Sequence, residues 1–180
     1  MTVLLSVVCL VNTLLLLAVI RRLNEQNRML REGVPAGERP PQGWPPPMAV
    51  EAGQRIGAFR VASLDGEVVA SDELEGEVLV GFLAPGCQAC DASLPGFVER
   101  AKATPGGRDR VLAVVMGDGA AAAEVHERLA PVARVLAENE EEGPLATAFG
   151  VGALPAFAVL SGSTLVASHS LIDRLEAPAT

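Results

Sequence analysis

The stretch VLVGFLAPGCQAC, residues 78–90, decides which fold this sequence predicts. Its first part, Val78–Leu83, is a continuous apolar run, which is typical of a β-strand that is buried on both faces. A Pro-Gly pair ends the run, and Ala89–Ala103 is predicted to form a helix directly after it. Cys87 and Cys90 therefore lie where a buried strand gives way to a helix.

The remainder of the chain alternates predicted strands and helices. The predicted strands are two short ones within Phe59–Ala70, then Val78–Leu83, Val111–Met116, Val132–Leu136, Ala156–Leu160 and Leu165–Ser168. The predicted helices are Ala89–Ala103, Ala120–Leu129 and the short Leu145–Phe149. The acidic run Glu138–Glu142 is most simply interpreted as a solvated loop. This order predicts an α/β fold with a mixed sheet of about five strands and helices on both faces.

The N-terminal part of the sequence has a different composition. Residues 2–20 are almost wholly apolar, and as a helix they would span about 28 Å, which matches a bilayer core. The segment has no basic start and no cleavage motif of small residues, so we expect a retained transmembrane anchor in which Cys9 is a small apolar residue. The expected organisation is an anchor at 1–22, a juxtamembrane helix and Pro-rich linker at 23–50, and a folded domain at 51–180.

The charge of the chain is unevenly distributed. The net charge is −8, and residues 51–180 carry nine Lys or Arg against nineteen Asp or Glu. So acidic a domain with few aromatic residues argues against a nucleic-acid partner. The arginines that follow the apolar segment suit anionic lipid headgroups. By the positive-inside rule alone, they would place the domain in the cytoplasm.

The two cysteines of the central stretch suit thiol–disulfide exchange. Cys87 would face the first N–H groups of the helix and the positive end of its dipole, which stabilise a thiolate. Cys90, three residues later, could attack a mixed disulfide formed at Cys87. We therefore expect Cys87 to be the exposed nucleophile and Cys90 the shielded resolving thiol. A static disulfide or a pair of inert thiols is the alternative.

One Cys-x-x-Cys motif cannot supply four ligands to zinc, and no second pair of Cys or His follows at a suitable spacing. We therefore expect no metal and no cofactor. Two histidines are weaker candidates for a function. His126 lies among charged residues of a predicted helix and is interpreted as solvated, whereas a catalytic role is conceivable for His169 at the end of the last strand.

Two motifs carry a resemblance to a known family. The run FLAPGCQAC, residues 82–90, followed by Leu94-Pro95, resembles the active-site region of thioredoxin-like proteins of the TlpA/ResA type. The run VGALPAF, residues 151–157, is similar to the segment that holds their cis-proline. The anchor, the arginines after it and the Pro-containing spacer are similar to MauD-type members. The resemblance implies a thioredoxin-like fold and a membrane-tethered thiol–disulfide oxidoreductase.

The resemblance also implies partners and further site residues. It implies protein disulfide substrates, which the protein would reduce or isomerise outside the cytoplasm, with electrons from a membrane thiol carrier. It further implies a cis peptide bond at Pro155, which would expose the Leu154 backbone for pairing with an extended substrate segment. An ordinary trans-proline at the start of an edge strand is the alternative. For the membrane side, the family pattern outweighs the arginines, so we expect the domain outside the cytoplasm.

The sequence departs from this family at two positions. Many thioredoxins carry a buried acid six residues before the first cysteine, where this chain has Gly81. Some TlpA/ResA-like proteins carry Glu three residues after the second cysteine, where this chain has Ser93. Neither residue can accept the proton of Cys90, so a water or another carboxylate must replace them, or exchange is slower.

Two other functions remain open on the sequence alone. One is a non-catalytic module that holds a client in the groove beside Pro155. The other is a peroxiredoxin-like peroxide reductase, which fits badly because it requires a Thr or Ser ahead of a lone peroxidatic cysteine.

Overall fold

The computed structural model describes residues 46–139 and 143–175. The predicted anchor, Cys9 and most of the predicted linker lie outside these ranges, as do residues 140–142 of the acidic run. No helix within the described ranges combines the length and the hydrophobicity that a membrane span requires.

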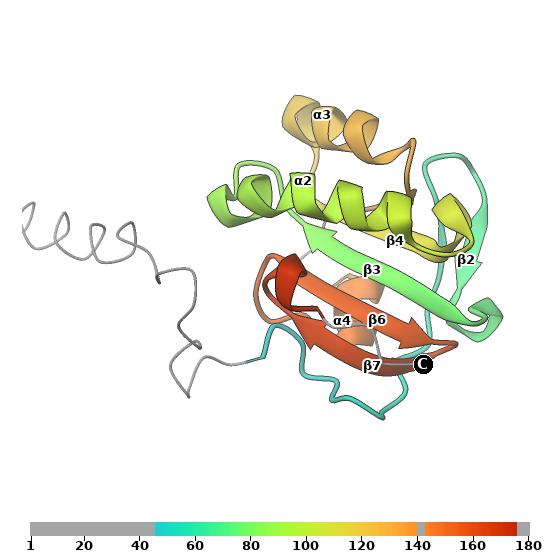
Figure 1. Cartoon of the computed structure of the whole chain (residues 1–180). Coiled ribbons are helices and arrows are strands. Elements are labelled where there is room, and N and C mark those ends of the chain that lie inside the picture. The colour runs from blue at the N-terminus through green and yellow to red at the C-terminus, as the bar shows by residue number, and fades with distance from the viewer. Residues whose placement is uncertain (1–45, 140–142, 176–180) are drawn as a thin grey trace, which may run out of the picture. The chain divides into compact units, whose positions relative to one another are not determined.

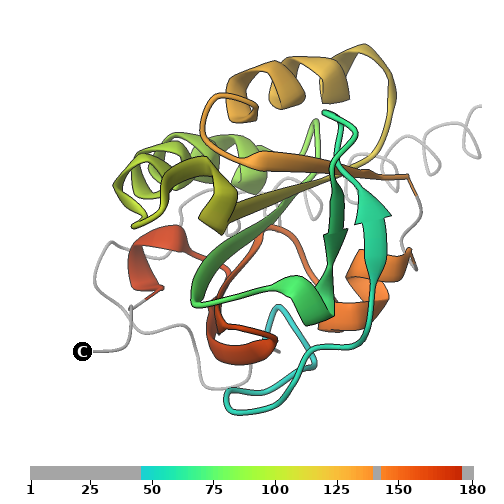
Figure 2. The ribbon, with the colours of Figure 1, turned by 90° about the vertical axis from the view of Figure 1, so that its right-hand side faces the viewer.

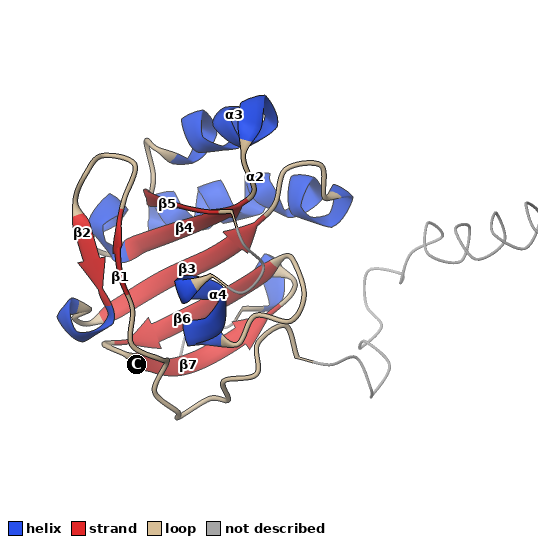
Figure 3. Ribbon diagram, turned by 180° about the vertical axis from the view of Figure 1, so that it is seen from behind, coloured by secondary structure: helices blue, strands red, loops and turns tan. Residues whose placement is uncertain are grey.

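A mixed five-stranded sheet forms the centre of the molecule, in the order β5-β4-β3-β6-β7 (Figure 1). Its strands are β3 (Glu77–Leu83), β4 (Val111–Met116), β5 (Arg134–Glu138), β6 (Ala156–Ser161) and β7 (Thr164–His169). The helices are α2 (Gln88–Ala103), α3 (Gly119–Leu129) and α4 (Pro144–Phe149), with 3₁₀ turns η1 (Ser71–Glu73), η2 (Gly107–Arg110) and η3 (Ile172–Arg174). Helices α2 and α3 cover one face of the sheet and α4 covers the other (Figures 1 and 3). This confirms the predicted architecture.

A hairpin of β1 (Arg60–Ala62) and β2 (Val68–Ala70) forms a separate two-stranded ribbon beside the main sheet (Figure 2). Its turn reaches the edge strand β5, where the Leu64 N–H donates to the Val135 carbonyl at 2.9 Å. The contact covers part of an edge that would otherwise leave backbone groups unpaired.

Strand β3 lies in the middle of the sheet because both of its faces are apolar. Every residue from Val78 to Leu83 is buried. The strand runs parallel to β4 and antiparallel to β6, with Phe82 opposite Ala156. Since side chains alternate between the two faces of a strand, β3 contributes to two cores.

The core on the α4 side of the sheet contains Val80 and Phe82 of β3 with residues of α4, β4 and the N-terminal hairpin. The core on the α2 side contains Leu79 and Leu83 of β3 with residues of α2, β4 and β6. Its other buried members include Cys90, Leu94, Phe97, Val111, Ala113, Val115 and Phe157. We call these the α4-side core and the α2-side core.

The prediction of a solvated acidic loop was wrong for Glu138. This residue ends β5, its exposed fraction is 5%, and its carboxylate accepts hydrogen bonds from the backbone N–H groups of Leu145 and Ala146. These are among the first N–H groups of α4, which have no partner within the helix. The run of acidic residues could not reveal that a helix several residues later would present donors to Glu138.

Residues before position 51, where the sequence predicted that the folded domain begins, also pack against it. Met48 is 1% exposed and forms a β-bridge with Val151. The Ala49 N–H donates to the Gly150 carbonyl at 2.7 Å. Strand β5 also lies at 134–138 rather than at the predicted 132–136, because Val132 belongs to the turn that follows α3.

Candidate functional site

A disulfide bond joins Cys87 and Cys90 at the start of α2. Their Cα atoms are 5.2 Å apart, within the usual range for a disulfide. The chain leaves β3 at Leu83 and turns through Gly86, whose positive φ of 72° is readily adopted by glycine. Cys87 then takes the N-cap position of the helix. The strand-to-helix position predicted for this motif is thus the one that the structure has.

The first turn of α2 faces the Cys87 sulfur. The backbone N–H of Cys90 donates to Cys87 Sγ at 3.2 Å. The N–H of Asp91 donates to the Cys87 carbonyl at 2.9 Å. When the disulfide is reduced, the same N–H group and the positive end of the helix dipole favour negative charge on Cys87.

The two cysteines differ in their access to solvent. Cys87 is partly exposed, whereas the exposed fraction of Cys90 is 2%. Cys90 belongs to the α2-side core, and Cys87 packs against the edge of that core. A reagent or a protein disulfide can therefore approach Cys87 directly and Cys90 only after a structural change.

The Leu154–Pro155 peptide bond is cis, as the resemblance implied. Pro155 directly precedes β6, whose first residue Ala156 pairs with Phe82 near the end of β3. The register therefore places Pro155 beside Leu83, at the end of β3 from which the chain continues to Cys87. Leu154 is partly buried and, like Cys87, packs against the α2-side core. The structure thus brings Cys87, Cys90, Leu154 and Pro155 together at one end of the two neighbouring strands β3 and β6.

The ring of Phe97 fills the space in front of Gly81. A Cβ atom built on Gly81 would lie 2.6 Å from Phe97 Cε2 and 2.8 Å from its Cζ, closer than real Cβ contacts. Phe97 is fully buried and stacks on Phe157, with 5.7 Å between the ring centroids. Sequence analysis missed this contact, although Phe97 follows Cys90 by seven residues and so shares its face of the helix.

The α2-side core contains no buried polar side chain. In the described part of the chain the buried polar or charged residues are Ser63, Ser71 and Glu138. Each of them accepts a hydrogen bond from a backbone N–H group: Ser63 from Glu67 in the β1–β2 turn, Ser71 from Phe59, and Glu138 from Leu145 of α4. None of the three belongs to the surroundings of Cys90.

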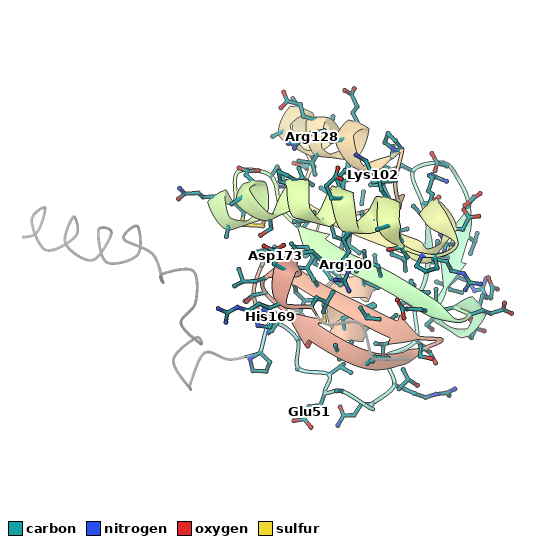
Figure 4. The ribbon with its side chains drawn as sticks, in the orientation of Figure 1. Glu51, Arg100, Lys102, Arg128, His169 and Asp173 are labelled. Carbon is teal, nitrogen blue, oxygen red and sulfur yellow. A yellow bond between two sulfur atoms is a disulfide. The ribbon has the colours of Figure 1, made fainter. Side chains whose placement is uncertain are left out.

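His169 lies on the α2 side of the sheet. It stands opposite Phe157, and residues directly opposite each other in an antiparallel pair point to the same face. Figure 4 shows it near Asp173 of η3. Its Nδ1 accepts a hydrogen bond of 2.9 Å from the Leu171 N–H. Burial lowers the pKa of His169 from its ordinary value, and the charge of Arg174 lowers it further.

His126 is less solvated than its charged neighbours in the sequence suggested. Its side chain is partly buried, and Nε2 is a buried atom without a hydrogen-bond partner among the described residues. Burial lowers the pKa of His126 as well. The described residues also contain no cluster of His, Cys, Asp or Glu that could hold a metal ion.

Comparison with solved structures identifies the fold. The thioredoxin domain of a thiol-disulfide oxidoreductase from Bacteroides vulgatus is similar with a TM-score of 0.54 and 16% identity, covering 67% of this chain and 89% of that one. A thiol:disulfide interchange protein from Bacteroides sp. has a TM-score of 0.53 and 18% identity, covering 67% and 82%. A thio-disulfide isomerase from Thermus thermophilus has a TM-score of 0.51 and 23% identity, covering 67% and 87%.

No family model matches the sequence, and no curated protein matches it either. At these levels of identity, the structural likeness shows that the chain has the thioredoxin-like fold. A fold supports many activities, so the function has to be argued from the site itself.

Proposed function

We propose that this protein is a thiol–disulfide oxidoreductase that reduces disulfides in protein partners through Cys87 and Cys90. The observation that carries the proposal is the Cys87–Cys90 disulfide at the start of α2, with the Cys90 N–H directed at Cys87 Sγ. A static disulfide between residues so close in sequence would constrain the unfolded chain little, so redox chemistry explains the pair better.

The reaction begins with the reduced protein. The Cys87 thiolate attacks one sulfur of a client disulfide, so a Cys87–client bond forms and the other client sulfur leaves as a thiolate. Cys90, after losing its proton, attacks Cys87 Sγ and displaces the second client sulfur. The client gains two electrons, and its second sulfur leaves as a thiolate that takes a proton from solvent, so the client becomes a dithiol while the protein returns to the disulfide state.

Pro155 and Leu154 form the proposed binding site for the client. The pairing of β3 with β6 supports this proposal, because Leu154 and Pro155 directly precede the residue of β6 that pairs with Phe82, near the point where the chain continues to the dithiol. An extended client segment can pair with a free backbone in this way, while its cysteine lies against Cys87.

The tether and the cellular side are part of the proposal and rest on sequence. Residues 2–20 would anchor the protein in the bilayer, and the domain would act outside the cytoplasm, where protein disulfides persist. A membrane thiol carrier would then supply the electrons that regenerate the dithiol. Protease treatment of intact cells tests this placement: degradation of the domain supports it, and protection of the domain until the cells are lysed contradicts it.

Trapping tests the activity. In Cys90→Ser the resolving thiol is missing, so mixed disulfides between Cys87 and client proteins should accumulate and be visible on non-reducing gels. Cys87→Ser is the matched control and should trap no client. If Cys90→Ser traps nothing and yet binds clients as wild type does, the protein is a non-catalytic binding module.

A further inference from the structure

Cys90 belongs to a part of the core in which no buried side chain is polar or charged. Its sulfur lies in the α2-side core, whose buried members are all hydrophobic. The three buried polar side chains of the described residues, Ser63, Ser71 and Glu138, have their partners elsewhere. Such surroundings favour the neutral thiol over the thiolate, although only the thiolate can attack Cys87.

Phe97 occupies the space that an acidic side chain at residue 81 would need in order to reach this core. Its ring lies so near Gly81 that a Cβ there would be 2.6 Å from Cε2. Phe97 is fully buried and held by its stacking on Phe157. An acidic side chain at residue 81 of the central strand would therefore have to displace the ring.

Charged and titratable side chains on α2, α3, β7 and η3 are each at least partly exposed. They are Asp91, Glu99, Arg100 and Lys102 on α2, Glu124, His126, Glu127 and Arg128 on α3, His169 on β7, and Asp173 and Arg174 on η3. On β5, Arg134 is partly exposed, and the buried Glu138 accepts hydrogen bonds from N–H groups of α4. None of these groups is a buried member of the α2-side core. The proton of Cys90 must consequently leave through the open face, where Cys87 and the client meet.

Resting on the proposed function, we infer that the client's own departing thiolate accepts the proton of Cys90. The attack of Cys87 breaks the client S–S bond and produces that thiolate at the open face. The thiolate takes the Cys90 proton and becomes a thiol. The new Cys90 thiolate then attacks Cys87 Sγ, the Cys87–Cys90 bond forms, and the second client sulfur leaves. One proton moves from Cys90 to the client, and two electrons pass from the dithiol to the client disulfide.

This mechanism selects a class of substrate. When both client cysteines belong to one chain, the departing thiolate stays near Cys90 and resolution is fast. When the disulfide joins two separate chains or small thiols, the first thiolate diffuses away and Cys90 must lose its proton to solvent. The preferred substrates are therefore intrachain protein disulfides.

A pair of matched peptides tests this inference with the reduced full-length protein in mild detergent. One peptide is closed by an intramolecular disulfide, and the other has the same sequence with the backbone cut between the cysteines. Acid quenching and mass spectrometry follow the conversion of the Cys87–peptide adduct into the Cys87–Cys90 disulfide in a single turnover, so that return of a tethered peptide thiolate to the closed peptide is not counted as resolution. At pH 7 the adduct with the cut peptide should persist at least about tenfold longer, because a cysteine thiol is mostly neutral there. Its decay should accelerate with rising pH and with added buffer base.

Equal adduct lifetimes for the two peptides would overturn the inference and leave the proposed function intact. Absence of an adduct with both peptides would overturn the proposed function as well. The two failures are therefore distinguishable in wild-type protein, before any variant is made.

Variants then identify the proton acceptor. Gly81→Asp combined with Phe97→Ala places an acid in the opened space and should shorten the lifetime of the cut-peptide adduct. Phe149→Ala, which removes an equally buried ring from the α4-side core, is the matched control and should preserve the difference between the peptides. His169→Gln should also preserve it. A slowing of about tenfold with the cyclic peptide in His169→Gln, near the lower end of general-base contributions, would assign the acceptor to the imidazole and overturn the inference.

Discussion

Glu138 Oε1 lies 2.7 Å from the backbone nitrogen of Leu145. The other carboxylate oxygen lies 2.8 Å from the nitrogen of Ala146, so one side chain serves two of the first N–H groups of α4. The short helix precedes the segment that leads to Pro155. Glu138 therefore fixes the start of the element that precedes the cis-proline, although it lies far from the dithiol in the sequence.

Glu138→Ala should lower the free energy of unfolding by about 2–4 kcal/mol, because it leaves two buried donors without a partner. Glu138→Gln keeps one acceptor oxygen and should lower the free energy of unfolding by less than Glu138→Ala does. Urea denaturation of the full chain in mild detergent measures both changes. Glu124→Ala on the exposed surface of α3 is the control, and a similar loss there would contradict this account.

Gly81→Ala should destabilise the protein by about 1–3 kcal/mol, because the added methyl group overpacks the core against Phe97. Phe97→Leu creates space at the same point and should recover part of that loss in the double variant. A double-mutant cycle in urea measures the coupling between the two positions. Strictly additive effects would mean that the ring and the glycine do not constrain each other.

Acid should weaken the fold partly through its histidines. Burial lowers the folded-state pKa of both His126 and His169, so below about pH 6.5 the unfolded chain binds more protons than the folded one. The stability that neutral histidines contribute is present above that pH and is lost as the pH falls through the folded-state pKa values. Urea midpoints compared at pH 7.5 and 5.5 measure the loss.

Substitution separates the histidines from the carboxylates, which also titrate in acid. The variant His126→Gln/His169→Gln should lose less stability over the same pH interval than the wild type. An unchanged pH dependence would show that other groups account for the whole effect.

The reduced protein should react unequally with alkylating reagents. Cys87 is partly exposed at a helix N-terminus, whereas Cys90 is 2% exposed, so iodoacetamide should modify Cys87 first. Peptide mapping by mass spectrometry distinguishes the two sites from each other and from Cys9. The preference should disappear in denaturant, and its persistence there would assign it to local sequence rather than to the fold.

Much of the fold could be predicted from local patterns. The apolar run of β3, the hairpin of β6 and β7 and the three helices each have a signal within a few residues, and the structure has all of them. The error in β5 had a local cause, since Val132 and Arg134 are both compatible with a strand start. The position of the dithiol was also local, because a strand, a turn and a helix follow one another directly in the chain.

The sequence by itself determined the order of strands and helices and the spacing of Cys87 and Cys90, because periodicity and turn residues act over short distances. Only the tertiary structure decided that Phe97 fills the space at Gly81, that Glu138 is buried against α4, and that Pro155 lies beside the end of β3. Each of these depends on which segments, distant in the chain, pack together. These segments pack together because both apolar faces of the sheet have to be buried at the same time. The sequence of any single segment does not show which other segments will cover it.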